Sequence, residues 1–212
     1  MYVDLRSAIG RGLFIQKEFD PGFFRPIEKA LGPGRTYLDL GANVGFYALL
    51  ARDIVGETGR VYAFEVDERA LRCLSKTVRS RGITNLHVNK AAVGRRNGKA
   101  YVVKQRDSGH TYVSDRMIRG ATEISVTTLD NWFERENRPQ IDVVKIDLEG
   151  AELDALQGAQ RMLSERRPVI VCEAAGAAGP TKSTVALRLR ELGYRVEAIP
   201  EVCSPAIVAY PE

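Results

Sequence analysis

The chain has 212 residues, of which 44% are hydrophobic and 27% charged, and its formal net charge at pH 7 is +4. This length and composition indicate one globular domain and exclude a disordered or fibrous chain. No apolar run approaches the roughly 20 residues of a membrane helix, the first residues lack the apolar stretch of a signal peptide, and the basic residues form no long path for nucleic acid. We therefore expect a cytoplasmic protein that binds neither a membrane nor nucleic acid.

Strands and helices alternate along most of the chain. Residues 1–36 are interpreted as a lead-in or lid segment with a helix over 23–31. Strands are then expected at 36–40, 60–65, 85–93, 141–147 and 168–173. Helices are expected at 45–54, 68–80, 131–136, 151–164 and 183–192.

This order predicts an α/β fold around a mostly parallel, doubly wound sheet. Two alternating stretches, 99–105 and 122–129, predict an extra β-hairpin between the third and fourth core strands, with a polar loop at 106–116. A closing hairpin, 194–199 with 206–210, would add an antiparallel edge. Cys172 lies in an apolar run and is interpreted as a small core residue.

The segment from Asp39 to Gly45 reads DLGANVG and lies where the first strand turns into a helix. Ligands of open α/β sheets bind at the C-terminal ends of the strands, so this turn is the first candidate site. The dinucleotide fingerprint would need a glycine at position 43, where the chain has Asn43, and no lysine follows as in a phosphate-binding loop. The free N–H groups of a helix N-terminus suit a carboxylate as well as a phosphate.

Two acidic residues favour a ligand that carries both an ammonium group and a ribose. Asp39 would repel a pyrophosphate and attract an ammonium. Glu65 follows the turn by about 20 residues, where an acidic side chain binds ribose hydroxyls. These features fit S-adenosylmethionine better than NAD. The alternative interpretation is a tight turn without a ligand, followed by a surface glutamate.

A second motif, KIDLEGAEL, spans residues 145–153 at the end of a strand. Asp147 ends the strand where the reacting methyl group of such a cofactor would lie. Lys145 lies within an apolar strand and is expected to pair with a carboxylate. Glu149 and Glu152 open the next helix, where acidic residues are favourable to the helix dipole, and this alone could explain both.

Together these residues resemble the FkbM-type methyltransferases, a family of S-adenosylmethionine-dependent enzymes. The resemblance rests on LDLGANVGFYALLAR, FEVDERALRCLSKTV, AAVGRRNGKA, SVTTLDNWF, IDVVKIDLEGAELDALQGA and PVIVCE, and its most specific part is TLD followed by KIDLEGAE. It implies a Rossmann-like class I methyltransferase fold, with residues 37–212 as the methyltransferase domain. Val66 departs from the family pattern, because many relatives have proline there.

The resemblance also implies roles for single residues. The methionine part of the cofactor would be held by Asp39, Gly41, Ala42, Asn43 and Gly45, and its ribose by Glu65. Val66 and residues 89–91, with Asn89 and Ala91 at their ends, would flank the adenine. Asp147 would lie at the reacting methyl group, and the product would be S-adenosylhomocysteine.

Methyl transfer mainly needs alignment of the nucleophile with the S–CH3 bond, and a base helps when the nucleophile is a hydroxyl. We expect Asp147 and Glu149 to position the nucleophile, with Glu173 as a third candidate. His110, on a loop that could cover the site, is a candidate base, whereas His87 is expected to be packed. Asp147, Glu149 and Glu173 could instead bind Mg²⁺ through oxygen ligands, an alternative that we do not favour.

The acceptor is the least specified part of the prediction. The resemblance implies O-methylation of a hydroxyl on a small molecule, sugar or natural product, with N-methylation of a peptide or amide as the alternative. An NAD-dependent oxidoreductase, disfavoured by Asn43, and a non-catalytic Rossmann-like binding protein are the alternatives from other classes. Phe23 and Phe24 of the lead-in segment, with His110 and Tyr112, are expected to form the acceptor's wall.

Overall fold

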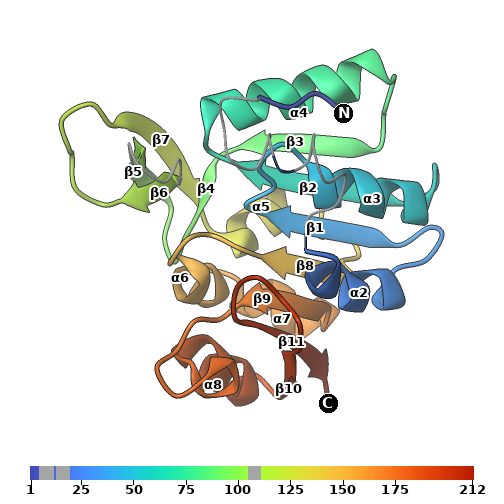
Figure 1. Ribbon diagram of the computed structural model, residues 1–212, viewed down its shortest axis with the longest axis vertical. Coiled ribbons are helices and arrows are strands. Elements are labelled where there is room, and N and C mark those ends of the chain that lie inside the picture. The colour runs from blue at the N-terminus through green and yellow to red at the C-terminus, as the bar shows by residue number, and fades with distance from the viewer. Residues whose placement is uncertain (5–11, 13–19, 105–110) are drawn as a thin grey trace.

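The computed structural model describes residues 1–4, 12, 20–104 and 111–212. A seven-stranded sheet forms its centre (Figure 1), and the strand order across this sheet is β10-β11-β9-β8-β1-β2-β3. These strands are β1 (Thr36–Leu40), β2 (Arg60–Glu65), β3 (Leu86–Lys90), β8 (Val143–Ile146), β9 (Val169–Glu173), β10 (Tyr194–Ile199) and β11 (Ala206–Pro211).

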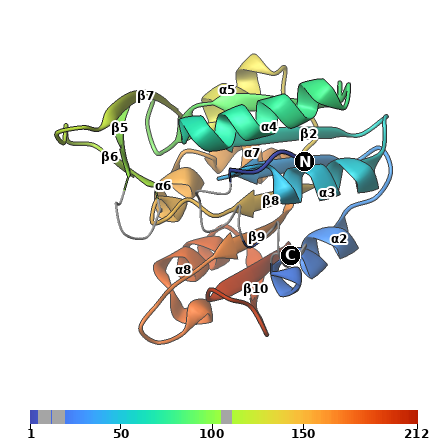
Figure 2. The same ribbon diagram turned by 45° about the horizontal axis from the view of Figure 1, so that its top comes forward.

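Helices cover both faces of this sheet (Figure 2). One face packs against α2 (Pro21–Ala30), α3 (Phe46–Val55) and α4 (Glu68–Ser80). The other packs against α5 (Leu129–Arg135), α6 (Glu152–Gln157), α7 (Gln160–Arg166) and α8 (Thr184–Glu191), which follows the short 3-10 helix η1 (Pro180–Lys182).

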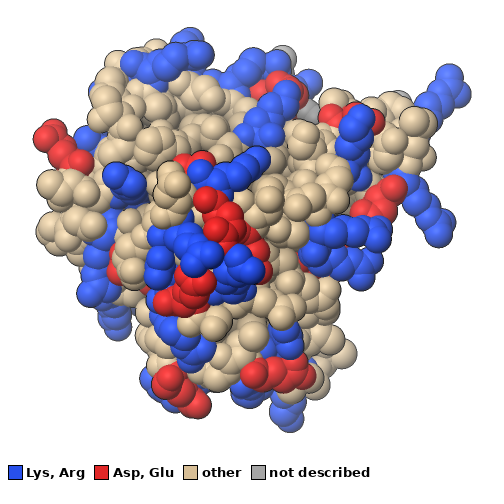
Figure 3. Space-filling model, turned by 180° about the vertical axis from the view of Figure 1, so that it is seen from behind, with Lys and Arg blue, Asp and Glu red and all other residues tan. Residues whose placement is uncertain are grey.

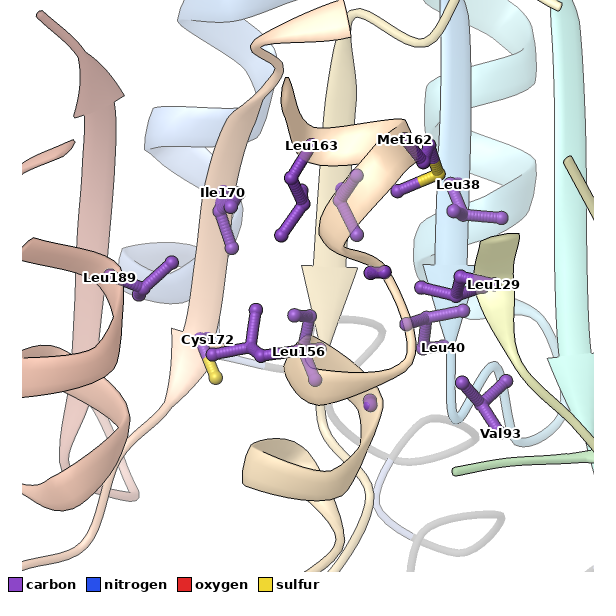
Figure 4. Packing of buried hydrophobic residues seen from close by; sticks show 14 of the residues in the cluster. Leu38, Leu40, Val93, Leu129, Leu156, Met162, Leu163, Ile170, Cys172 and Leu189 are labelled. Carbon is purple, nitrogen blue, oxygen red and sulfur yellow. The ribbon is translucent and has the colours of Figure 1, made fainter. Parts of the chain in front are cut away.

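Two hydrophobic cores result, because successive side chains of a strand point to opposite faces of the sheet. In β1, Leu38 and Leu40 pack on the α5–α8 side and Tyr37 packs on the α2–α4 side. Figure 4 shows the first of these cores, where Cys172 lies among leucine side chains with no exposed surface, as expected for a core residue.

The direction of one strand differs from the rest of the sheet. β11 runs antiparallel to both β9 and β10, and the neighbouring strands from β9 to β3 pair in parallel. The expected closing hairpin is present, but its antiparallel strand is not at the edge. After β9 the chain passes through α8 and forms β10 at the edge of the sheet. β11 then pairs between β10 and β9.

A second, four-stranded sheet projects from the body beside β3 (Figure 1). Its order is β4-β7-β5-β6, with β4 (Ala92–Val93), β5 (Gly98–Lys104), β6 (Thr111–Ser114) and β7 (Thr122–Thr127). The expected pairing of two strands here is confirmed as β5 with β7. The single strand expected at 85–93 is wrong, because Ala91 separates β3 from β4, which joins the other sheet. The expected polar loop is also wrong in part, because β6 pairs with β5.

The helix expected at 151–164 is divided into α6 and α7 around Gly158. A Cβ at Gly158 would lie 2.1 Å from the carbonyl oxygen of Gly94, so the close approach of two backbones fixes a glycine there. The carboxylate of Asp130 then accepts hydrogen bonds from the backbone N–H groups of Arg161 and Met162, at 3.0 and 2.9 Å. Tertiary contacts therefore end one helix and start the next.

Acidic and basic side chains lie next to one another on the face behind Figure 1 (Figure 3). On α5 and α7, Glu134 forms ion pairs with Arg138 and Arg161. Such exposed pairs contribute little stability each. Among the helices described, none combines the length and the apolar character needed to cross a bilayer.

Candidate functional site

The C-terminal ends of four neighbouring parallel strands bring the main candidates to one edge of the sheet. Asp39 lies near the end of β1, Glu65 ends β2, Asp147 follows β8 and Glu173 ends β9. Neighbouring strands lie about 4.8 Å apart, so these side chains meet across short distances. The edge of the sheet where ligands were expected therefore carries four carboxyl groups.

The turn after β1 needs left-handed backbone conformations. The φ angles are 81° at Gly41, 51° at Asn43 and 85° at Gly45. The backbone N–H of Asn43 donates to Glu65, that of Val44 donates to the side chain of Asn43, and that of Gly45 donates to the carbonyl of Ala42. The expectation that this turn offers free N–H groups is therefore wrong for these three residues, because they fold the turn itself.

Gly41 is packed against the end of β8. A Cβ at this position would lie 1.9 Å from the backbone oxygen of Asp147. The backbone N–H groups of Gly41 and Ala42 both donate to the carbonyl of Phe64 in β2. The turn is thereby held between β2 and β8, and only a residue without a side chain fits at its start.

Lys145 supplies the one ammonium group seen among these carboxylates in the described residues. It is 1% exposed, and its Nζ lies 3.1 Å from Oδ1 of Asp39 and 3.5 Å from Oδ2 of Asp147. It also donates to the carbonyl of Gly41 at 2.9 Å. Burial lowers the pKa of Lys145, but the charges of both aspartates outweigh it and the net pKa is raised. The expectation that Lys145 pairs with a carboxylate is confirmed, and the ammonium also holds the start of the turn after β1 through the carbonyl of Gly41.

Asp39 is fully buried, and its carboxylate is only half satisfied. Oδ1 accepts a hydrogen bond from Lys145, whereas Oδ2 has no hydrogen-bond partner within the described parts of the chain. Burial raises the pKa of Asp39, against the lowering effects of the Lys145 ammonium and, more weakly, of the backbone N–H of Ala48, which approaches the carboxylate without forming a hydrogen bond of normal geometry to Oδ2. A buried carboxylate oxygen without a hydrogen bond costs free energy, so a hydrogen-bond donor or a cation supplied by a ligand would stabilise it.

Glu65 connects the loop that follows β1 with the loop that follows β2. Its Oε1 accepts from the backbone N–H groups of Val66 and Asp67, both at 2.6 Å, and its Oε2 accepts from that of Asn43 at 2.7 Å. Burial raises the pKa of Glu65, while these three hydrogen bonds lower it, and the net direction is upward. A carboxylate offers about four acceptor positions, so these three hydrogen bonds leave about one of them for a ligand.

The loop between β8 and α6 is shaped by Glu152. Its Oε1 accepts from the backbone N–H groups of Leu148 and Gly150, at 2.9 and 3.0 Å. Glu149 and Gly150 both have positive φ angles, 52° and 105°. Glu152 therefore holds this loop through two hydrogen bonds, a structural role different from the favourable helix-dipole position expected for it.

Glu173 is half-buried beside Asp147. The two carboxyl groups lie within hydrogen-bonding reach of each other, and Ser204, in the loop between β10 and β11, reaches Glu173 from the other side. Burial, followed by the charge of Asp147, raises the pKa of Glu173 to about 7, although Ser204 lowers it. Sequence reasoning missed Ser204, because no periodic pattern relates that loop to β9.

The residues expected around adenine lie between the two sheets. Val66 packs against the small hydrophobic cluster of the second sheet, which consists of Ala92, Ala100, Val102 and Ile124. Asn89 and Ala91 line a pocket of about 460 Å³ between β3, the second sheet and α5. The pocket's remaining polar side chains are Lys90, Asn97, Ser125, Thr127, Asn131 and Arg135.

Other candidates have different positions. His110 lies outside the described residues. Phe23 packs in the core and does not line a surface, whereas Phe24 stacks on Tyr47 at 5.7 Å between ring centroids. His87, expected to be packed, is exposed because β3 is an edge strand, and its ring stacks on Tyr62. Within the described ranges no group of three or more acidic, histidine or cysteine side chains has the arrangement of a metal site.

Comparisons with known proteins give the family and the fold. The profile of the Methyltransferase FkbM domain matches residues 39–196. The chain is 18% identical to an FkbM methyltransferase from Methylobacillus flagellatus KT, with a TM-score of 0.64 over 93% of this chain and 50% of that one. It thus spans half the length of that protein. No curated protein matches the sequence.

Two further solved structures share the fold. A ribosomal protein L11 methylase from Lactobacillus delbrueckii subsp. bulgaricus is 11% identical, with a TM-score of 0.57 over 90% of this chain and 77% of that one. Fibrillarin from Aeropyrum pernix, solved with natively bound S-adenosyl-L-methionine, is 18% identical, with a TM-score of 0.54 over 85% and 68%. The arrangement of the main sheet is therefore that of the class I S-adenosylmethionine-dependent methyltransferases.

Proposed function

The chain belongs to the FkbM methyltransferase family, and we propose that it binds S-adenosylmethionine at the carboxyl edge of the main sheet and methylates a hydroxyl group of a small molecule, sugar or natural product. The finding that carries the proposal is Oδ2 of Asp39, a fully buried carboxylate oxygen without a partner in the described residues. An ammonium group satisfies such an atom, and a pyrophosphate does not.

The remaining contacts fit the same cofactor. The turn from Gly41 to Gly45 would hold the methionine part beside Asp39. Glu65 has one acceptor position left for a ribose hydroxyl, and the side chains of Val66, Asn89 and Ala91 would flank the adenine.

When bound, S-adenosylmethionine supplies a methyl group already activated by its sulfonium charge. The residues of the chain then have to orient the acceptor, exclude water and receive its proton. We expect Asp147, which pairs with Lys145, and Glu149 in the adjoining loop to orient the acceptor, and an acidic edge favours a cationic cofactor.

The test is calorimetry with S-adenosylmethionine, S-adenosylhomocysteine and NAD. We expect binding of the first two and weaker or no binding of NAD. Asp39→Asn should weaken S-adenosylmethionine at least tenfold, because an amide does not carry the charge that the ammonium needs. Asp53→Asn, a matched change at an exposed residue of α3, should leave the affinity unchanged.

Binding of NAD more tightly than S-adenosylmethionine, or no binding of S-adenosylmethionine, would overturn the proposal. The type of acceptor is tested separately, with a methyl-transfer assay on a panel of hydroxyl and amide compounds. Transfer to amides alone would replace O-methylation by N-methylation and leave the cofactor assignment intact.

A further inference from the structure

Asp147 and Glu173 form a pair of unequal carboxyl groups. Ile146 of β8 pairs with Cys172 of β9, so the residues that follow them, Asp147 and Glu173, lie side by side at the edge of the sheet. Their carboxyl groups are within hydrogen-bonding reach. Only Asp147 has an ion pair, with Lys145 at 3.5 Å. In the part of the chain that the structure describes, no basic side chain pairs with Glu173.

We propose that Glu173 is the general base that receives the proton of the acceptor hydroxyl, and that the carboxylate of Asp147, held by Lys145, orients this hydroxyl. The inference rests on the proposed methyl transfer and goes beyond it, because it divides two neighbouring carboxyl groups between two roles. Glu173 is half-buried, which leaves it surface with which to touch an acceptor.

The surroundings of Glu173 support this division. The charged and polar groups that face it or its strand are Lys145 on β8, Asp147 and Glu149 in the following loop, Glu152 on α6 and Ser204 in the loop between β10 and β11. Burial and the charge of Asp147 raise the pKa of Glu173 to about 7. A base whose pKa lies near the working pH is the most effective one, and carboxyl pairs with different environments commonly divide acid and base roles.

Asp147 is less suited to carry the proton. Its carboxylate is paired with the Lys145 ammonium, which also contacts Asp39 and the carbonyl of Gly41. A proton on Asp147 would weaken this pair and with it the hold on the turn after β1. The same ammonium thus links Asp147 to Oδ1 of Asp39, the residue whose other oxygen, Oδ2, has no hydrogen-bond partner in the described residues.

The proposed step balances as follows. The carboxylate of Glu173 takes the hydroxyl proton while the acceptor oxygen forms a bond to the methyl carbon. The carbon–sulfur bond breaks, and its electron pair stays on sulfur. The products are the methyl ether, S-adenosylhomocysteine and protonated Glu173, which then releases its proton to water.

The release of protons when S-adenosylmethionine binds tests the proposed role of Glu173 without an acceptor. A sulfonium charge at this edge should lower the pKa of Glu173, and a group with a pKa of about 7 gives up at most about half a proton at pH 7. Calorimetry in buffers of different ionisation enthalpy should therefore show release with S-adenosylmethionine and much less with the uncharged sulfide S-adenosylhomocysteine. This comparison uses the unaltered protein, so it does not depend on the folding of a variant.

Glu173→Gln should abolish that difference, and because proton release and affinity are linked, the loss of this carboxylate should weaken S-adenosylmethionine by roughly two- to tenfold. Glu57→Gln, an exposed glutamate before β2, is the matched control and should retain the full proton release. Equal release with both ligands in the unaltered protein, or full release in Glu173→Gln, would overturn the inference and leave the proposed function standing. Failure of S-adenosylmethionine to bind would instead overturn the proposed function, and the inference with it.

Discussion

Replacing Lys145 by Met tests the buried ion pair that Lys145 forms with Asp39. The ammonium is 1% exposed, pairs with the fully buried Asp39 at 3.1 Å and donates to the carbonyl of Gly41 at 2.9 Å. Methionine has a similar length and no charge, so the change leaves Asp39 buried without its cation. Removing one partner of a buried pair in this way costs about 3–5 kcal/mol of the free energy of unfolding.

A double-mutant cycle measures this coupling. Urea unfolding at pH 7 should show Lys145→Met destabilised by about 3–5 kcal/mol, and Lys145→Met with Asp39→Asn should recover about 2 kcal/mol, because a neutral amide is cheaper to bury than an unpaired carboxylate. Lys90→Met is the control. It removes an exposed ion pair with Glu68 and should cost less than about 1 kcal/mol.

The reasoning fails if the two single changes are additive, since additivity means that the two groups do not interact. It also fails if Lys145→Met costs no more than Lys90→Met. In that case Asp39 would be held by other contacts, and the ammonium would not be the element that fixes the turn.

Three further changes probe the turn and the carboxyl groups. Gly41→Ala should lower the melting temperature far more than Gly56→Ala, because both have positive φ but only Gly41 would bring a Cβ to 1.9 Å from a carbonyl oxygen. Glu65→Gln should weaken S-adenosylmethionine about tenfold by calorimetry and also lower the melting temperature, because one of its oxygens becomes a donor facing a backbone N–H. Glu173→Gln should raise the free energy of unfolding, relative to the unaltered protein, more at pH 8 than at pH 5. The folded carboxyl, with a pKa of about 7, holds its proton more tightly than the unfolded one at 4.5, so unfolding free energy falls as pH rises between these values. The full effect is about 3 kcal/mol at about 1.4 kcal/mol per pKa unit, and solvent screening of this half-buried group reduces it to about 1 kcal/mol, measurable by thermal melts at both pH values.

The main sheet was predictable because its strands are short apolar runs between clear turns. The bounds of β1, β2 and α4 agree with the periodicity residue for residue. The errors lie where a contact from elsewhere ends an element. Gly158 divides a continuous apolar pattern because Gly94 approaches it, and β6 forms from polar residues because β5 offers it a backbone to pair with.

The positions of the site residues were predictable, but their partners were not. The rule that ligands bind at the C-terminal ends of strands places Asp39, Glu65 and Asp147 correctly at one edge. Which atom binds which depends on loop conformation. No periodic pattern in the sequence indicates that Glu65 accepts hydrogen bonds from three backbone N–H groups. None indicates that Ser204, in a loop about 30 residues later, contacts Glu173.

The absence of a glycine at position 43 and the acidic side chains at this edge of the sheet both disfavour a pyrophosphate. In the described residues Lys145 is the only basic side chain that pairs with Asp39 and Asp147, and none pairs with Glu173. The edge therefore carries excess negative charge whether or not Glu173 is protonated. A pyrophosphate brought there would add two negative charges beside half-buried carboxylates, which is unfavourable in a medium of low polarity. An ammonium and a sulfonium would each reduce the excess. The selection between cofactors therefore resides in the charges around the turn as much as in the turn's own shape.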